Sequence, residues 1–111
     1  MFCCALLLSA CGKNIEKQIE EDLVTITTDP KLQFSSNPYV NITNNKKSYD
    51  DIVRHGEPAL PYLVQTLKAS ENNGLKEWVM AYACMDILGE KNPVKEWATG
   101  KEWLNSYELG K

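Results

Sequence analysis

Arginine, histidine and phenylalanine are scarce in this chain of 111 residues, which has one arginine, one histidine and two phenylalanines beside eleven lysines. The sequence contains no His-Glu-x-x-His pair, no Gly-x-Ser-x-Gly elbow and no glycine-rich phosphate loop. Its net charge of −3 gives no clustered positive charge of the kind that nucleic acid attracts. We therefore expect no catalytic residues, no metal, no cofactor and no nucleic-acid partner.

Cysteine and long apolar runs are also few. The four cysteines are Cys3, Cys4, Cys11 and Cys84, and the adjacent first pair lacks the spacing of a zinc site. The apolar or small-residue run Phe2 to Ala10 is too short to cross a membrane, which needs roughly 20 residues. Its length is typical of the hydrophobic core of a secretory signal.

The residues that end this run, Leu8-Ser9-Ala10-Cys11, resemble the lipobox of bacterial lipoproteins. The resemblance implies a signal peptide over residues 1–10, cleavage before Cys11 and attachment of diacylglycerol to the Cys11 thiol. Residues 11–14 would then be the lipid-bearing tether. The implied location is the cell membrane, lipid-anchored on its extracytoplasmic face. The alternative is a buried N-terminal helix in which Cys11 acts as a small apolar residue.

Under the lipoprotein interpretation, Cys3 and Cys4 leave with the signal and Cys11 carries lipid. Cys84 is then alone, so the mature chain has no intramolecular disulfide. Because Cys84 lies in the densest apolar stretch, we expect it to be part of the core rather than a reactive thiol.

The length and composition predict one small all-α domain. Apolar residues at three- and four-residue steps predict an N-terminal helix over 15–28, although the β-branched residues 24–28 leave a strand open there. Residues 29–47 are rich in serine, asparagine and lysine and are expected to form a polar linker, with a short helix after Pro38.

The remaining segment, 48–111, carries the strongest helix signals. We expect Ser48 to cap a helix that ends at Arg54-His55-Gly56, which makes the only histidine a helix-terminal residue. A core-facing helix follows over 57–67, and a helix that is apolar on nearly every face runs from 75 to 88. Thr99 and Glu102 form a capping-box pattern that opens the last helix.

Trp97 and Trp103 flank this last cap, and we expect them to hold the final helix on the core. The rival interpretation is an aromatic interaction surface for a ligand or a partner, which would require exposed rings.

The stretch Gly56 to Leu67, with its Pro-Ala-Leu-Pro-Tyr-Leu opening, resembles the start of a HEAT or armadillo-type helical repeat, and residues 48–88 match the length of one unit. The resemblance implies a small helical bundle that binds proteins and has no catalytic residue. Since a solenoid needs three or more units, we expect the flanking segments to act as capping helices.

These observations favour a membrane-anchored, non-catalytic lipoprotein whose helical domain binds a protein in the cell envelope. Two alternatives stay open. One is a small envelope hydrolase using acids among Glu77, Asp86, Glu90, Glu96 and Glu102. The other is a ligand-binding lipoprotein with a cavity around Trp78, Tyr82 and Met85.

Overall fold

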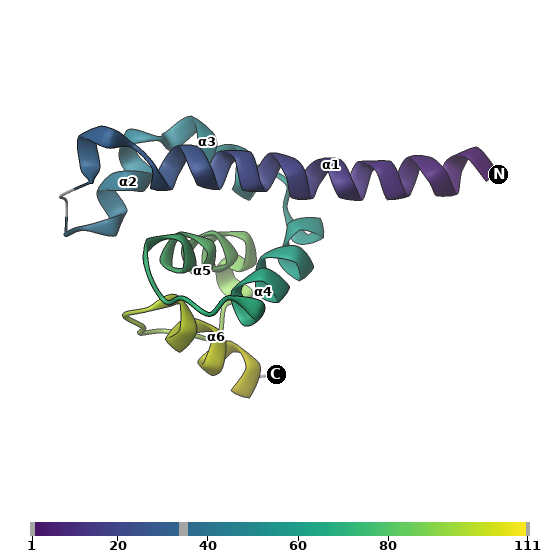
Figure 1. Ribbon diagram of the computed structural model, residues 1–111. Coiled ribbons are helices and arrows are strands. Elements are labelled where there is room, and N and C mark those ends of the chain that lie inside the picture. The colour runs from purple at the N-terminus through teal and green to yellow at the C-terminus, as the bar shows by residue number, and fades with distance from the viewer. Residues whose placement is uncertain (1, 34–35, 111) are drawn as a thin grey trace.

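The computed structural model of the chain describes the backbone of residues 2–33 and 36–110 and the side chains of 14–33 and 36–110. The described residues form six α-helices joined by loops and three short 3-10 turns (Figure 1). The helices are α1 (Phe2–Thr27), α2 (Pro38–Asn44), α3 (Lys46–Arg54), α4 (Leu60–Ala69), α5 (Leu75–Leu88) and α6 (Gly100–Leu109), and the turns are η1 (Pro30–Leu32), η2 (Glu57–Ala59) and η3 (Gly89–Lys91). The all-α class predicted from the sequence is confirmed.

The second half of α1 lies across the bundle, and its first half projects beyond it (Figure 1). Ile19, Leu23 and Ile26 are fully buried, which matches their three- and four-residue spacing. The strand alternative for residues 24–28 is excluded as far as Thr27, where α1 ends. Thr25 and Thr27 each donate a hydroxyl hydrogen bond to the carbonyl four residues earlier, so both side-chain hydroxyls are satisfied within the helix.

The segment 29–47 contains the short helix expected after Pro38. Asn37 caps α2 by accepting a hydrogen bond from the Tyr39 N–H, and Pro38 occupies the first turn. Asn41 and Ile42 are buried, and the Asn41 amide donates to the carbonyl of Ile26 at the end of α1. This helix is therefore packed on the bundle.

The predicted start of the next helix was wrong by two residues. Ser48 lies inside α3, which begins at Lys46 after Asn45. The Asn45 amide donates to Asp29 and to the Asn41 carbonyl, so tertiary contacts fix the chain before Ser48. The predicted end is confirmed: Gly56 has a φ of 70°, a left-handed conformation that favours glycine.

Helix α5 is the centre of the domain and contacts the five other helices. Its apolar residues are buried on several faces, as the sequence predicted; they include Val79, Met80, Ala81, Ala83 and Cys84. Helix α6 packs on α5 and α4, and the Thr99 hydroxyl caps it by accepting from the Glu102 N–H. Along α1, helix α2 lies beside the C-terminal end, where Asn41 bonds the Ile26 carbonyl, and Pro58 of η2 and Pro61 of α4 lie beside Ile15.

Candidate functional site

Five aromatic rings from separate parts of the chain form a continuous cluster on one side of α5. We call Tyr39, Tyr49, Trp78, Tyr82 and Trp97 the ring cluster. Trp78 stacks on Tyr82 at a centroid distance of 5.0 Å, and Trp97 lies 5.5 Å from Trp78. Tyr39 and Tyr49 approach Tyr82 at 5.6 and 6.0 Å. Helix α5 thus provides two central rings, and α2, α3 and the segment before α6 add one each.

The exposure of the rings is graded from the core to the surface. Tyr49 is buried, Trp78, Tyr82 and Trp97 are half-buried, and Tyr39 is 46% exposed. An exposed tyrosine on top of packed aromatic rings is a rigid surface, because the rings beneath it limit its movement. Tyrosine and tryptophan in this setting are enriched at protein interfaces, where each contributes a large area with few rotatable bonds.

A carboxylate lies at the edge of the cluster. The Tyr49 hydroxyl donates a hydrogen bond of 2.5 Å to Asp86. Burial, together with this bond to an acceptor, raises the pKa of Tyr49 far above its usual range. Burial also raises the pKa of Tyr82, and the nearby Asp86 charge adds to the effect. Both phenols are therefore neutral donors at physiological pH.

A groove of about 710 Å³ borders the cluster at Trp78. Its walls come from the end of α1 and η1, the start of α2, the start of α5 and the segment Ala98–Thr99. The lining is mixed, with Leu32 and Trp78 beside polar residues such as Thr27 and Asn73. Such a mixed lining next to aromatic rings can accept a polypeptide segment or a small molecule.

The structure separates the two tryptophans that the sequence singled out. Trp97 belongs to the ring cluster. Trp103 is fully buried and stacks on Tyr107 at 4.8 Å, and its indole N–H donates to Asn92. Trp103 thus holds α6 on the core and offers no exposed ring face to a partner.

Sequence reasoning noted Trp78 and Tyr82 only as lining of an internal cavity, and it missed Tyr39 and Tyr49 as site residues. The four-residue spacing of Trp78 and Tyr82 was a usable signal, since it places both on one face of a helix. No local sequence pattern connects Tyr39 and Tyr49 with Trp78 and Tyr82. Tyr39 and Tyr49 approach Tyr82 only because α2 and α3 pack on α5.

The acids considered for hydrolysis are dispersed. Glu77 is buried in the first turn of α5 and accepts hydrogen bonds from the Gly74 N–H and the Ser70 hydroxyl, both at 2.8 Å. Burial alone would raise the pKa of Glu77, but these two donors lower it below its usual value. Glu77 is therefore a structural cap. The three later glutamates, Glu90, Glu96 and Glu102, are exposed.

A second hollow between α1 and α3 holds the only histidine. Asp22, Asp51 and His55 line it together with Gln18, Glu21 and Arg54. Burial and then the Asp51 charge raise the pKa of Asp22. Within the described side chains, no three His, Cys, Asp or Glu residues are placed to hold a metal ion.

The two remaining cysteine predictions have different outcomes. Cys84 is fully buried, and this burial raises the pKa of its thiol to about 12, which confirms its place in the core. The proposed lipid-attachment residue, Cys11, lies outside the described side chains. Among the described residues, no helix combines the length and the apolar character needed to span a bilayer.

No protein-family model, no curated protein and no solved structure matches the chain.

Proposed function

We propose that this protein is a lipid-anchored bacterial lipoprotein of the cell envelope, without catalytic activity, whose helical domain binds another protein through the ring cluster. The anchor is supported by the lipobox-like Leu8-Ser9-Ala10-Cys11. The observation that carries the binding role is the ring cluster itself, in which Tyr39 is 46% exposed above packed aromatic rings.

The proposed binding surface combines two features of protein interfaces. The ring cluster gives a rigid aromatic centre, and the adjacent groove gives polar groups around it. In such interfaces a few aromatic residues carry most of the binding free energy. Tyr39 and Trp97 are the proposed contact residues, because one is exposed and the other is half-buried at the edge of the cluster.

The repeat-like architecture belongs to the same proposal. Helices α4 and α5, joined by a short loop, would correspond to the helix pair of one HEAT-type unit, with α1 and α6 as capping helices. With a single unit the partner would bind the cluster and its groove, rather than the long concave surface of a solenoid.

Site-specific photo-crosslinking in cells tests the binding role. A photoreactive phenylalanine at position 39 should give one dominant adduct with an envelope protein. The same probe at Ser106, an exposed position of α6, should not give it. The purified partner should then bind the wild-type protein, and Tyr39→Ala with Trp97→Ala should weaken binding by roughly 30-fold or more, the effect typical of interface hot spots. Equal adducts at both positions, or unchanged affinity in the double variant, would contradict the proposal.

A ligand-binding role is the second candidate, favoured by the groove volume of about 710 Å³, which falls within the range of small-molecule sites. Its readout is tryptophan fluorescence, because Trp78 lines the groove and stacks on Tyr82. A ligand that enters the groove should change the emission of the wild-type protein, and this change should be lost in Trp78→Phe while Trp103 still reports an intact fold.

A further inference from the structure

The end of the bundle that carries Ile15 lies close to the proposed lipid, and this inference rests on the lipid anchor proposed above. Among the described side chains of α1, which begin at Asn14, Ile15 is the first that packs on the core. Only three residues separate it from Cys11. Four residue steps span about 6 Å as a helix and about 14 Å fully extended. The anchor therefore gives the domain almost no freedom to move away from the bilayer.

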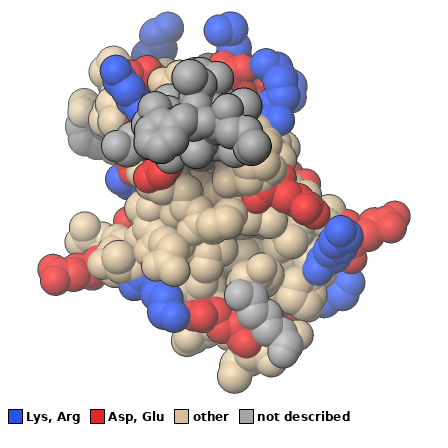
Figure 2. Space-filling view, turned by 90° about the vertical axis from the view of Figure 1, so that its right-hand side faces the viewer, with Lys and Arg blue, Asp and Glu red and all other residues tan. Residues whose placement is uncertain are grey.

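A surface with one exposed carboxylate, Glu16, among otherwise uncharged lining residues lies at this end. Ile15 borders a hollow of about 380 Å³ together with Pro58, Pro61, Tyr62, Gln65 and Glu16. We call Ile15, Pro58, Pro61, Tyr62 and Gln65 the proximal face. Figure 2 looks onto the end from which the first half of α1 projects and shows an uncharged centre, with charged side chains mainly around it.

The proximal face is suited to the headgroup region of a bilayer. The two proline rings are exposed, and Ile15 and Tyr62 are half-buried. Tyrosine is favoured at the membrane interface because its ring is apolar while its hydroxyl is polar. At the rim, Glu57 forms an ion pair with Lys91 at 3.4 Å and Glu20 one with Lys76 at 3.2 Å, and Glu16 is exposed. We infer that the proximal face rests on the phospholipid surface when Cys11 is acylated.

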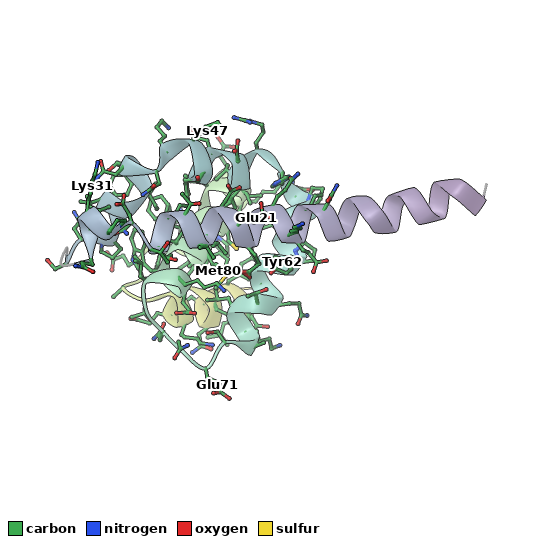
Figure 3. All side chains as sticks on the ribbon, turned by 45° about the horizontal axis from the view of Figure 1, so that its top comes forward. Glu21, Lys31, Lys47, Tyr62, Glu71 and Met80 are labelled. Carbon is green, nitrogen blue, oxygen red and sulfur yellow. The ribbon has the colours of Figure 1, made fainter. Side chains whose placement is uncertain are left out.

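This orientation places the ring cluster away from the membrane. The twelve steps of α1 from Ile15 to Thr27 span about 18 Å. Thr27 borders the groove beside Trp78, whereas Ile15 borders the proximal face. Figure 3 shows Lys31 beyond the C-terminal end of α1 and apart from Tyr62, whose hydroxyl donates to Glu20 in the middle of the packed part of that helix. A protein partner could thus reach Tyr39 without displacing lipid.

A depth measurement tests the orientation. The full chain is expressed, and the protein extracted from membranes is analysed by mass spectrometry for an acylated Cys11. Single cysteines are introduced by Gln65→Cys on the proximal face and by Thr43→Cys on α2, both at exposed helical positions. Each is labelled with bimane; Cys84 is buried and should not react. The labelled proteins are reconstituted in phosphatidylcholine vesicles that contain a headgroup-spin-labelled phospholipid.

In acylated protein, the label at position 65 should be quenched several-fold more strongly than the label at position 43. Equal quenching, or stronger quenching at position 43, would overturn the orientation while leaving the anchor in place. A mass that shows an intact initiator methionine and no lipid would overturn the anchor, and the orientation with it. If either variant fails to fold, Glu57→Cys and Asn44→Cys provide a second exposed pair at the two ends.

Discussion

Gly100 lies directly against the backbone of Glu77, so that α6 begins in contact with the first turn of α5. A Cβ atom on Gly100 would come within 2.4 Å of the Glu77 carbonyl oxygen and within 2.6 Å of its carbon. Only a residue without a side chain permits this approach. The contact brings Thr99 and the start of α6 beside the loop that precedes α5.

Gly100→Ala should therefore destabilise the domain by about 1–3 kcal/mol, because the opposing atoms are backbone and cannot move aside cheaply. Urea unfolding followed by circular dichroism measures the loss. Ser106→Ala, at an exposed position of the same helix, is the matched control and should change the free energy of unfolding by no more than about 0.5 kcal/mol. Equal stability of the two variants would show that the helices can separate at this point.

Glu77 should make the stability depend on pH in the acid range. Its folded pKa lies below its usual value, so its charged form stabilises the fold above that value, near pH 4.5. This contribution should be lost as the pH falls through the lowered folded pKa. In Glu77→Gln, unfolding free energies measured from about pH 6 to about pH 3 should fall less steeply than in the wild type. A variant with the same pH slope as the wild type would contradict this role.

Cys84 should be unreactive in the folded protein. Its thiol is fully buried, and its pKa is raised to about 12 by that burial, so almost no thiolate is present near neutral pH. Peptide mapping after treatment with iodoacetamide should find no adduct at Cys84 in buffer and a complete adduct in concentrated urea. Rapid labelling under native conditions would mean that α5 opens locally.

Truncation of Trp103 and of Trp97 to alanine should lower the stability of the domain by different amounts. Trp103→Ala should cost about 3–5 kcal/mol, since the whole side chain is buried and stacks on Tyr107. Trp97→Ala should cost clearly less, because its ring is half-buried at the edge of the ring cluster. Thermal unfolding of both variants compares their stabilities. A larger loss of stability in Trp97→Ala than in Trp103→Ala would contradict the placement of Trp103 in the core and of Trp97 at the surface.

The sequence was most informative where the signal is local. The apolar pattern of Leu75–Leu88 predicted a central helix, and Thr99 predicted a helix start, because periodicity and capping depend on near neighbours. Ser48 had the same capping signal but was overridden. Asn45 is held by Asp29, sixteen residues away, and this contact fixes the chain before Ser48 can cap it.

The candidate site was less predictable, because most of it is assembled by distant contacts. Trp78 and Tyr82 share a helical face and could be paired from their spacing. Tyr39 and Trp97 reach them only after α2 and the segment before α6 have packed on α5. Pairwise ring contacts between such separated residues leave no pattern in a single sequence.

The loop between α4 and α5 is exposed at Asn72 and Asn73 and is a tempting place for an epitope tag or a protease site. It is, however, a junction of three helices. The Lys101 ammonium of α6 donates to the carbonyls of Leu67 and Ser70, and the Lys101 N–H donates to Asn73. An insertion in this loop would therefore disturb the hydrogen bonds that hold α6 against the end of α4 and the start of α5. Reporter sequences are better placed after Leu109, which is 88% exposed.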